Sequence, residues 1–305
     1  MGYANILWAI VIIVFLIDII WINFSSFSIY YNLSDLGLYI FILLTFFIPY
    51  LFYKKFRPDL RMTTALLSFC WLLSFTGGAI VLSYLAYTTD RALVTQALAD
   101  IDSYLGIYPP AIVMWFWNHS WLNILSIIIY TSFLYQKPFI LLYFSLRKDL
   151  YHLQSFIMQY MIAVLITICI GAYFPAEGTY AWYHFKPFTS QLGDVQRLYE
   201  LRQNIVNLKA LNGIIEFPSL HSALAVIYIY TFRDERRIIF IPVLILNILL
   251  LFSCISTGGH FFIDVLAGIA IAIVAIGIER LIFHAVQNSQ LKRAEEKKQI
   301  KSSTL

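Results

Sequence analysis

The chain alternates long apolar runs with short polar connections, and this pattern predicts an all-α, polytopic membrane protein. Eight runs reach or approach the roughly 20 residues that a helix needs to cross a bilayer. They cover residues 4–24, 36–53, 62–87, 120–146, 151–173, 218–232, 237–256 and 259–283. Gln136, Lys137 and Pro138 interrupt the fourth run, so we expect a kink or an early end there.

The polar stretches between these runs also contain helical patterns. Apolar residues recur at helical spacing in residues 90–105, which predicts a helix lying along the membrane interface. The tryptophans between residues 115 and 121 have the composition of an interfacial anchor. The long segment 174–217 contains an amphipathic stretch, Leu192–Leu208, and leads directly into the sixth run. We expect this segment to act as a lid or a recognition element.

Composition strengthens the membrane assignment. The 305 residues are 60% hydrophobic and only 12% charged, with 25 Phe and 21 Tyr, which exceeds what a soluble core needs. The net charge of +4 is modest, so nothing indicates a surface for nucleic acid. The three cysteines, Cys70, Cys169 and Cys254, lie inside apolar runs at no metal-binding spacing, and we expect them to be small buried hydrophobes.

Basic residues gather on one side of the eight-span arrangement. Residues 284–305 form a tail on this side, and we expect its charged part, from Gln290 onward, to be frayed. By the positive-inside rule this side and both termini are cytoplasmic. The opposite side of this multi-pass protein then faces a periplasm, the cell exterior or an organelle lumen. The basic clusters are Lys54–Arg57, Arg147-Lys148, Arg233–Arg237 and the tail from Lys292.

Two short motifs, Phe217–Ser222 and Ser256–Asp264, place histidines at the outward ends of predicted helices. His260 and Asp264 are four residues apart and therefore share one face of a helix. A carboxylate behind an imidazole fixes the tautomer and raises the basicity of the other ring nitrogen. His221, in the first motif, is of the residue type that exchanges protons near neutral pH. Together they offer a nucleophile, an orienting group and an acid.

The residues around the histidines favour an oxyanion ligand. Pro218 suits the first turn of a helix, and Ser219 lies beside the free backbone N–H groups of that positive helix end. Gly259 leaves the backbone next to His260 open to close approach. Asp264, one turn into a membrane helix, is costly without a partner. Phosphate is the common biological oxyanion for such a site.

The same residues resemble a known family. Pro218–His221, followed by Gly259–Asp264, is similar to the second and third signature blocks of the type-2 phosphatidate phosphatase superfamily. This resemblance implies a six-helix phosphatase-type bundle, here residues 88–283, preceded by extra membrane helices in residues 1–87. It also implies a reaction through a phosphohistidine.

The resemblance implies a role for each matching residue. His260 corresponds to the nucleophile, Asp264 to its orienting partner and His221 to the acid that protonates the leaving oxygen. Ser219 and Gly259 lie where a phosphoryl group is bound. No cofactor is implied, and the histidines have no third ligand at a metal-binding spacing.

The chain departs from the common family pattern in its arginines. Leu220 replaces a glycine of the second block, and Cys254 stands where the third block has its arginine. Lys55–Pro58 has the residue types of the first block but lies on the predicted cytoplasmic side, so we reject it. We expect Arg202, on the outward side, to bind the phosphate instead.

Upstream residues point to a subgroup. Asp102-x-x-Leu-Gly, Tyr130-x-Ser with Gln136, and Phe174-Pro175-Ala176 are similar to inositol phosphorylceramide synthases and their relatives. The resemblance then covers roughly residues 90–280. It leaves hydrolysis and transfer open, because water or an alcohol can accept the phosphoryl group.

Two classes of function follow. The first is a membrane enzyme that acts on a lipid phosphate or diphosphate from the outer leaflet, as a phosphatase or as an inositolphosphotransferase or phosphosphingolipid headgroup transferase. Its partners are then the substrate and the bilayer. The second is a catalytically inert lipid-binding or transport protein, which the missing arginines motivate. The identity of the lipid and the oligomeric state are not readable from the sequence.

Overall fold

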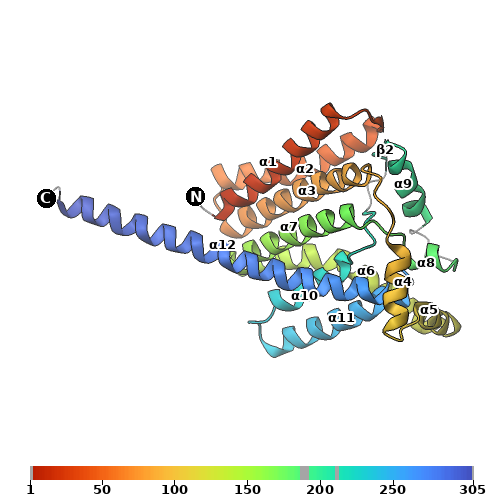
Figure 1. Ribbon diagram of the computed structural model, residues 1–305. Coiled ribbons are helices and arrows are strands. Elements are labelled where there is room, and N and C mark those ends of the chain that lie inside the picture. Colours follow the sequence, from red (N-terminus) through yellow and green to blue (C-terminus); the bar gives the residue numbers. More distant parts are fainter. Residues whose placement is uncertain (1–2, 186–191, 210–212, 304–305) are drawn as a thin grey trace.

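The computed structural model describes residues 3–185, 192–209 and 213–303, apart from the side chains of 192–194 and 290–303 (Figure 1). The predicted all-α architecture is confirmed: twelve helices and one two-stranded sheet lie in this part of the chain. The helices are α1 (Tyr3–Phe24), α2 (Leu33–Lys55), α3 (Leu60–Tyr87), α4 (Thr95–Tyr104), α5 (Pro109–Asn118), α6 (Ser120–Leu146), α7 (Leu150–Tyr173), α8 (Thr179–Trp182), α9 (Leu192–Arg202), α10 (Leu220–Thr231), α11 (Arg237–Ser256) and α12 (Phe262–Ser303).

Seven of these helices are long and apolar enough to cross a membrane: α1, α2, α3, α6, α7, α11 and α12. The remaining predicted span, the sixth run over residues 218–232, is α10, which has only 12 residues. At 1.5 Å per residue it is about 18 Å long, well short of a hydrocarbon core of about 30 Å. Helix α10 alone is therefore too short to cross a bilayer, and its first turn is held against the first turn of α12.

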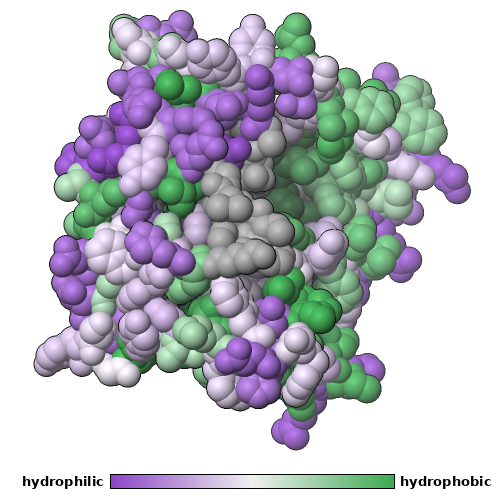
Figure 2. Space-filling view, turned by 90° about the vertical axis from the view of Figure 1, so that its right-hand side faces the viewer, coloured by the Kyte–Doolittle hydropathy of each residue, from purple (hydrophilic) through white to green (hydrophobic). Residues whose placement is uncertain are grey.

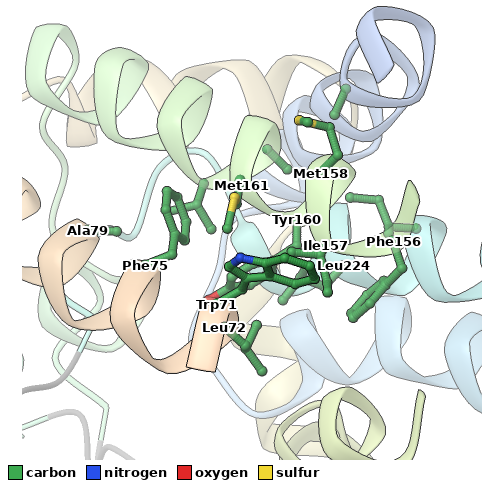
Figure 3. Packing of buried hydrophobic residues seen from close by; sticks show 14 of the residues in the cluster. Trp71, Leu72, Phe75, Ala79, Phe156, Ile157, Met158, Tyr160, Met161 and Leu224 are labelled. Atoms are coloured by element: carbon green, nitrogen blue, oxygen red, sulfur yellow. The ribbon is translucent and has the colours of Figure 1, made fainter. Parts of the chain in front are cut away.

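Helix α7 lies at the centre of the bundle and packs against α3, α6, α10 and α12. Trp71 and Phe75 of α3 meet Ile157 and Met161 of α7, and Leu224 of α10 lies in the same cluster (Figure 3). Helices α1 and α2 lie on the outer side of α3. The predicted division at residue 87 falls after α3, yet α3 packs on α6 and α7 as part of the bundle.

Helix α6 does not end early at Pro138, one of the two outcomes that we expected there. It continues from Ser120 to Leu146 with Pro138 inside it. A proline is tolerated in a membrane helix when neighbouring helices pack around it, and α6 packs on α3, α7 and α11. Lys137, just before this proline, consequently lies within α6.

The cysteines match their prediction only in part. Cys70 and Cys254 are buried, and Cys169 is exposed on α7. None of the three forms a disulfide. An exposed cysteine on a membrane-spanning helix is still compatible with an apolar surrounding.

Short helices cover one end of the bundle (Figure 1). The interfacial helix predicted within residues 90–105 is α4, and it packs on α12. The helix predicted over Leu192–Leu208 ends at Arg202, because Ile205–Asn207 forms strand β2 and pairs in parallel with β1 (Ser28–Tyr30). The sequence pattern could not reveal this pairing, since its partner lies far away along the chain.

The tail also differs from its prediction. The backbone of α12 stays helical to Ser303, where we expected fraying, and the helix projects beyond the bundle at the end opposite α4 (Figure 1). One helix therefore connects the two ends of the molecule.

Helices α10 and α12 approach each other at Gly268. A Cβ atom at this position would lie 2.2 Å from the carbonyl oxygen of Ser219 and 2.9 Å from the Cβ of Ser222. Glycine is needed here for space, and small residues allow such close contact between membrane helices. The start of α10 is therefore held directly against α12.

Substituting this glycine tests the contact. We expect Gly268→Ala to force the helices apart and to destabilise the protein by about 1–3 kcal/mol, the usual cost of overpacking. Gly277→Ala, on the same helix with nothing within 4 Å of the added Cβ, is the matched control. Thermal unfolding in detergent should show a lower Tm for the first variant only. Equal Tm values would contradict the close packing.

Candidate active site

Backbone contacts join the two histidine motifs. Ser219 N–H donates to the carbonyl oxygen of Asp264 at 3.1 Å, which ties the start of α10 to the first turn of α12. Ser219 is also the N-cap of α10, because its hydroxyl accepts from Ser222 N–H at 3.3 Å. Ser219, His260 and Asp264 are all buried. Residues distant in sequence thus form one compact cluster.

The His260 ring is held by its Nδ1 atom. Nδ1 lies 2.9 Å from the carbonyl oxygen of Glu216 and 3.5 Å from Oδ2 of Asp264. A carbonyl oxygen only accepts, so Nδ1 carries the proton and Nε2 of the neutral ring keeps its lone pair. The Nε2 atom is consequently the nucleophilic one.

The charge state of His260 depends on opposing effects. Burial disfavours the imidazolium, but the hydrogen bond to Asp264 and the Glu216 carboxylate, 3.9 Å from Nδ1, outweigh it. The pKa of His260 is therefore raised above its usual value. A positive charge on this ring is stabilised where it forms.

Two carboxylates hold the backbone at the start of α12. Asp264 Oδ2 accepts from Phe261 N–H at 2.9 Å. Asp102 of α4, which is fully buried, accepts from Phe262 N–H at 2.7 Å and from Ile263 N–H at 3.0 Å. Burial raises the pKa of Asp102, and these two hydrogen bonds offset only part of the rise. Asp102 therefore caps α12 from a different helix.

His221 faces His260 from the first turn of α10. The two ring centroids are 5.6 Å apart. Tyr130 stacks on His221 at 4.5 Å, and its hydroxyl lies 3.4 Å from Nδ1. Phe133 meets the same ring edge-on at 4.1 Å. These residues of α6 fix the orientation of His221.

The turn before His260 is shaped by α8 and by an aromatic ring. Gly258 has a φ of +79°, a conformation that favours glycine, and a Cβ there would lie 2.6 Å from the Phe185 ring. Thr179 donates from its hydroxyl to the carbonyl oxygen of Gly258 at 2.6 Å. Gly259 and His260 are thereby presented on a fixed turn.

Arg202 is the one predicted site residue that the structure places apart from this cluster. Its Nη1 donates to the carbonyl oxygen of Arg91 at 2.7 Å, and its Nη2 lies 2.7 Å from Asp90 Oδ1. These contacts fasten the end of α9 to the segment that follows α3. The other five predicted residues, Ser219, His221, Gly259, His260 and Asp264, lie together.

Three further residues belong to the cluster and were not predicted in these roles. Glu216 contributes a main-chain carbonyl and a carboxylate, and Asp102 contributes a helix cap, although the sequence had marked Asp102 only as a point of resemblance. Tyr87, at the end of α3, has a buried hydroxyl with no hydrogen-bond partner among the described residues. The charges of Glu216 and Asp264 act on it. Only Asp102 carried a signal in the sequence.

The arrangement can perform nucleophilic catalysis with acid–base assistance. A nucleophilic nitrogen, a carboxylate behind it and a second imidazole are the groups that phosphoryl transfer through a covalent intermediate requires. Within the described ranges, no three His, Cys, Asp or Glu side chains are grouped so that they could hold a metal ion.

Comparison with known proteins agrees with this chemistry. A family model described as the PAP2 superfamily matches residues 96–278, more than half of the chain, and this stretch includes both histidine motifs. No curated protein and no solved structure matches the chain. The chain therefore belongs to the PAP2 superfamily of phosphatase-type membrane proteins.

Proposed function

We propose that the protein transfers the phosphoryl group of a lipid phosphate or diphosphate through a phosphohistidine at His260. One observation carries this proposal: Nδ1 of His260 is held by Glu216 and Asp264, so Nε2 keeps its lone pair, and the His221 ring lies 5.6 Å away between centroids. A histidine with only a structural role needs no second imidazole beside it.

In the first step, Nε2 of His260 forms a bond to phosphorus while the bond from phosphorus to the leaving oxygen breaks. His221 gives its proton to that oxygen. The positive charge that appears on the His260 ring is stabilised by Asp264 and Glu216. In the second step, His221 takes a proton from water or an alcohol, whose oxygen attacks phosphorus and releases His260.

The phosphoryl oxygens need hydrogen-bond donors. We propose the start of α10, with Ser219, and the backbone at Gly259 for this role, since N–H groups at a helix N-terminus bind anions. Arg202 can take part only if its guanidinium leaves Asp90 and the Arg91 carbonyl. Tyr87 offers a further O–H group beside the two carboxylates.

The surface at this end of the bundle supports a lipid substrate. His221 lies in the first turn of α10, whose start contacts the first turn of α12, and α4 packs on α12. Figure 2, which views the end covered by the short helices, shows a hollow with a hydrophobic surface. A lipid phosphate can present its headgroup to the histidines while its chains stay in an apolar surrounding.

Transfer to an alcohol, as in inositolphosphotransferases and phosphosphingolipid headgroup transferases, is the second candidate. Cys254 replaces an arginine of the common third block, and the upstream resemblance favours that subgroup. Phosphate-release assays with and without an alcohol acceptor separate the two reactions, because transfer yields a new lipid instead of free phosphate.

A catalytically inert lipid-binding protein is the competing class. It is favoured by the absence of that arginine and by the engagement of Arg202 with Asp90. The enzyme and the inert protein differ in turnover alone, so variants of the two histidines distinguish them.

We expect His260→Gln to abolish phosphate release from lipid phosphates, because the nucleophile is lost. His221→Gln should reduce kcat by about 10²–10⁴-fold, the usual contribution of a general acid. His284→Gln, an exposed histidine on α12, is the control and should retain full activity. If the native protein and His260→Gln are equally inactive on a broad lipid panel, the enzymatic proposal fails.

The Glu216 carboxylate should set the acid limb of the pH profile. The native enzyme loses kcat/KM as the pH falls through the raised pKa of His260, because protonated Nε2 cannot attack. Glu216→Gln removes a negative charge, lowers that pKa and should shift the acid limb to lower pH. Glu200→Gln, on α9, is the control. An unchanged acid limb in Glu216→Gln would contradict this role.

We also propose that the site faces away from the cytoplasm, because the basic clusters lie at the opposite end. In a variant with the native cysteines replaced by alanine, Ser103→Cys on α4 should react with a membrane-impermeant maleimide in intact cells. Arg236→Cys, between α10 and α11, should react only after permeabilisation. The reverse pattern would overturn the orientation.

A further inference from the structure

Lys137 is a charged side chain that the proposed reaction has not used. It lies on α6, inside the bundle, with Nζ 5.2 Å from the centroid of the Phe133 ring and 5.6 Å from that of Tyr160 on α7. Tyr160 is buried, and its hydroxyl lies 2.9 Å from Oγ1 of Thr76 on α3. The ammonium therefore points from α6 toward Tyr160 of α7.

No anion from the described part of the chain balances this ammonium. Among the described residues, Lys137 has aromatic rings as its neighbours and makes neither an ion pair nor a hydrogen bond. Cation–π contacts stabilise an ammonium that is held away from water, but they do not fully offset the cost of placing a lysine in a membrane helix. Lysines that persist in such positions mark a site for an anion or an ion pathway.

The position of Lys137 relative to the histidines indicates which anion it meets. Phe133, one helical turn before Lys137, touches the His221 ring at 4.1 Å between centroids. The positive charge of Lys137 also acts on His221. Lys137 therefore lies on the His221 side of the histidine pair, where the proposed reaction places the leaving group.

We propose that Lys137 binds an anionic leaving group and that the substrate is a lipid diphosphate. This inference rests on the proposed function and specifies its substrate class. When the substrate is a lipid monophosphate, the leaving group is a neutral alcohol, which gives Lys137 nothing to bind. When the substrate is a lipid diphosphate, the leaving group is a lipid monophosphate, whose negative charge the ammonium stabilises.

Cleavage of a lipid diphosphate then takes two steps. His260 Nε2 bonds to the terminal phosphorus, and the bond from that phosphorus to the bridging oxygen breaks. The bridging oxygen leaves as part of the lipid monophosphate and takes the proton of His221. The Lys137 ammonium pairs with the negative charge that remains on the other oxygens of this monophosphate. Water then hydrolyses the phosphohistidine, so one lipid monophosphate and one inorganic phosphate form per turnover.

The test compares two substrates on the purified full-length protein in lipid–detergent micelles. One is an isoprenyl diphosphate and the other is a diacyl phosphatidate. The native protein should show a higher kcat/KM for the diphosphate. Lys137→Met should lower that value by about 10²-fold, the usual loss of one charge-stabilising group, and should lower kcat/KM for phosphatidate by a clearly smaller factor, because that substrate leaves no anion for Lys137 to bind.

Two further variants separate charge from packing. Lys137→Arg keeps the positive charge and should retain more diphosphate activity than Lys137→Met. Lys54→Met is the matched control, because Lys54 also lies over an aromatic ring, Tyr50, but on the peripheral helix α2. It should behave as the native protein does on both substrates.

The possible results are distinguishable. Equal losses on both substrates in Lys137→Met, or a native protein that prefers phosphatidate, would overturn the diphosphate inference and leave the proposed function standing. Inactivity of the native protein on both substrates would overturn both. If Lys137→Met does not fold, the native substrate preference and Lys137→Arg still decide the question.

Discussion

The structure depends on the direct contact between the starts of α10 and α12. Within a membrane, a backbone N–H or C=O group without a partner costs several kcal/mol. Here Ser219 N–H uses the Asp264 carbonyl, and His260 uses the Glu216 carbonyl, so each motif satisfies polar groups of the other. Gly268 supplies the space that this approach requires. The active cluster and the helix packing are consequently the same feature.

The short helices α4 and α8 support the contact between α10 and α12. Asp102 on α4 caps α12, and α8 fixes the turn at Gly258 through Thr179. Phe185 closes over that turn. The short helices are therefore part of the scaffold of the site, and their removal would leave the first turn of α12 with unpaired N–H groups.

Much of this architecture was predictable, because apolar length and helical spacing are local properties of the sequence. The limits of the predicted spans lie within a few residues of the helices, except at the end of α12, which continues to Ser303. His260 and Asp264 lie close together as expected, although His260 precedes α12 instead of sharing a helix face with Asp264. The family resemblance added the expectation that His221 would join them. Each of these predictions needs only residues close to one another along the chain, or a known motif.

The predictions that differed depend on distant contacts. Leu192–Leu208 ends as a strand because β1 lies beside it, and α6 continues through Pro138 because three helices pack around it. Arg202 was expected in the site because of its predicted side of the membrane, but the sequence carries no signal that Asp90 is its partner. Glu216 was invisible as a site residue because its main contribution is a carbonyl oxygen, which every residue has.

The carbonyl oxygen of Glu216 constrains how the proposed nucleophile, His260, can vary in evolution. The tautomer of His260 is set by a main-chain atom, which no point substitution at Glu216 removes. Its basicity is tuned by side chains, which substitutions change freely. Such a division makes the identity of the attacking atom robust to mutation while the working pH range stays adjustable, so the two properties can evolve separately.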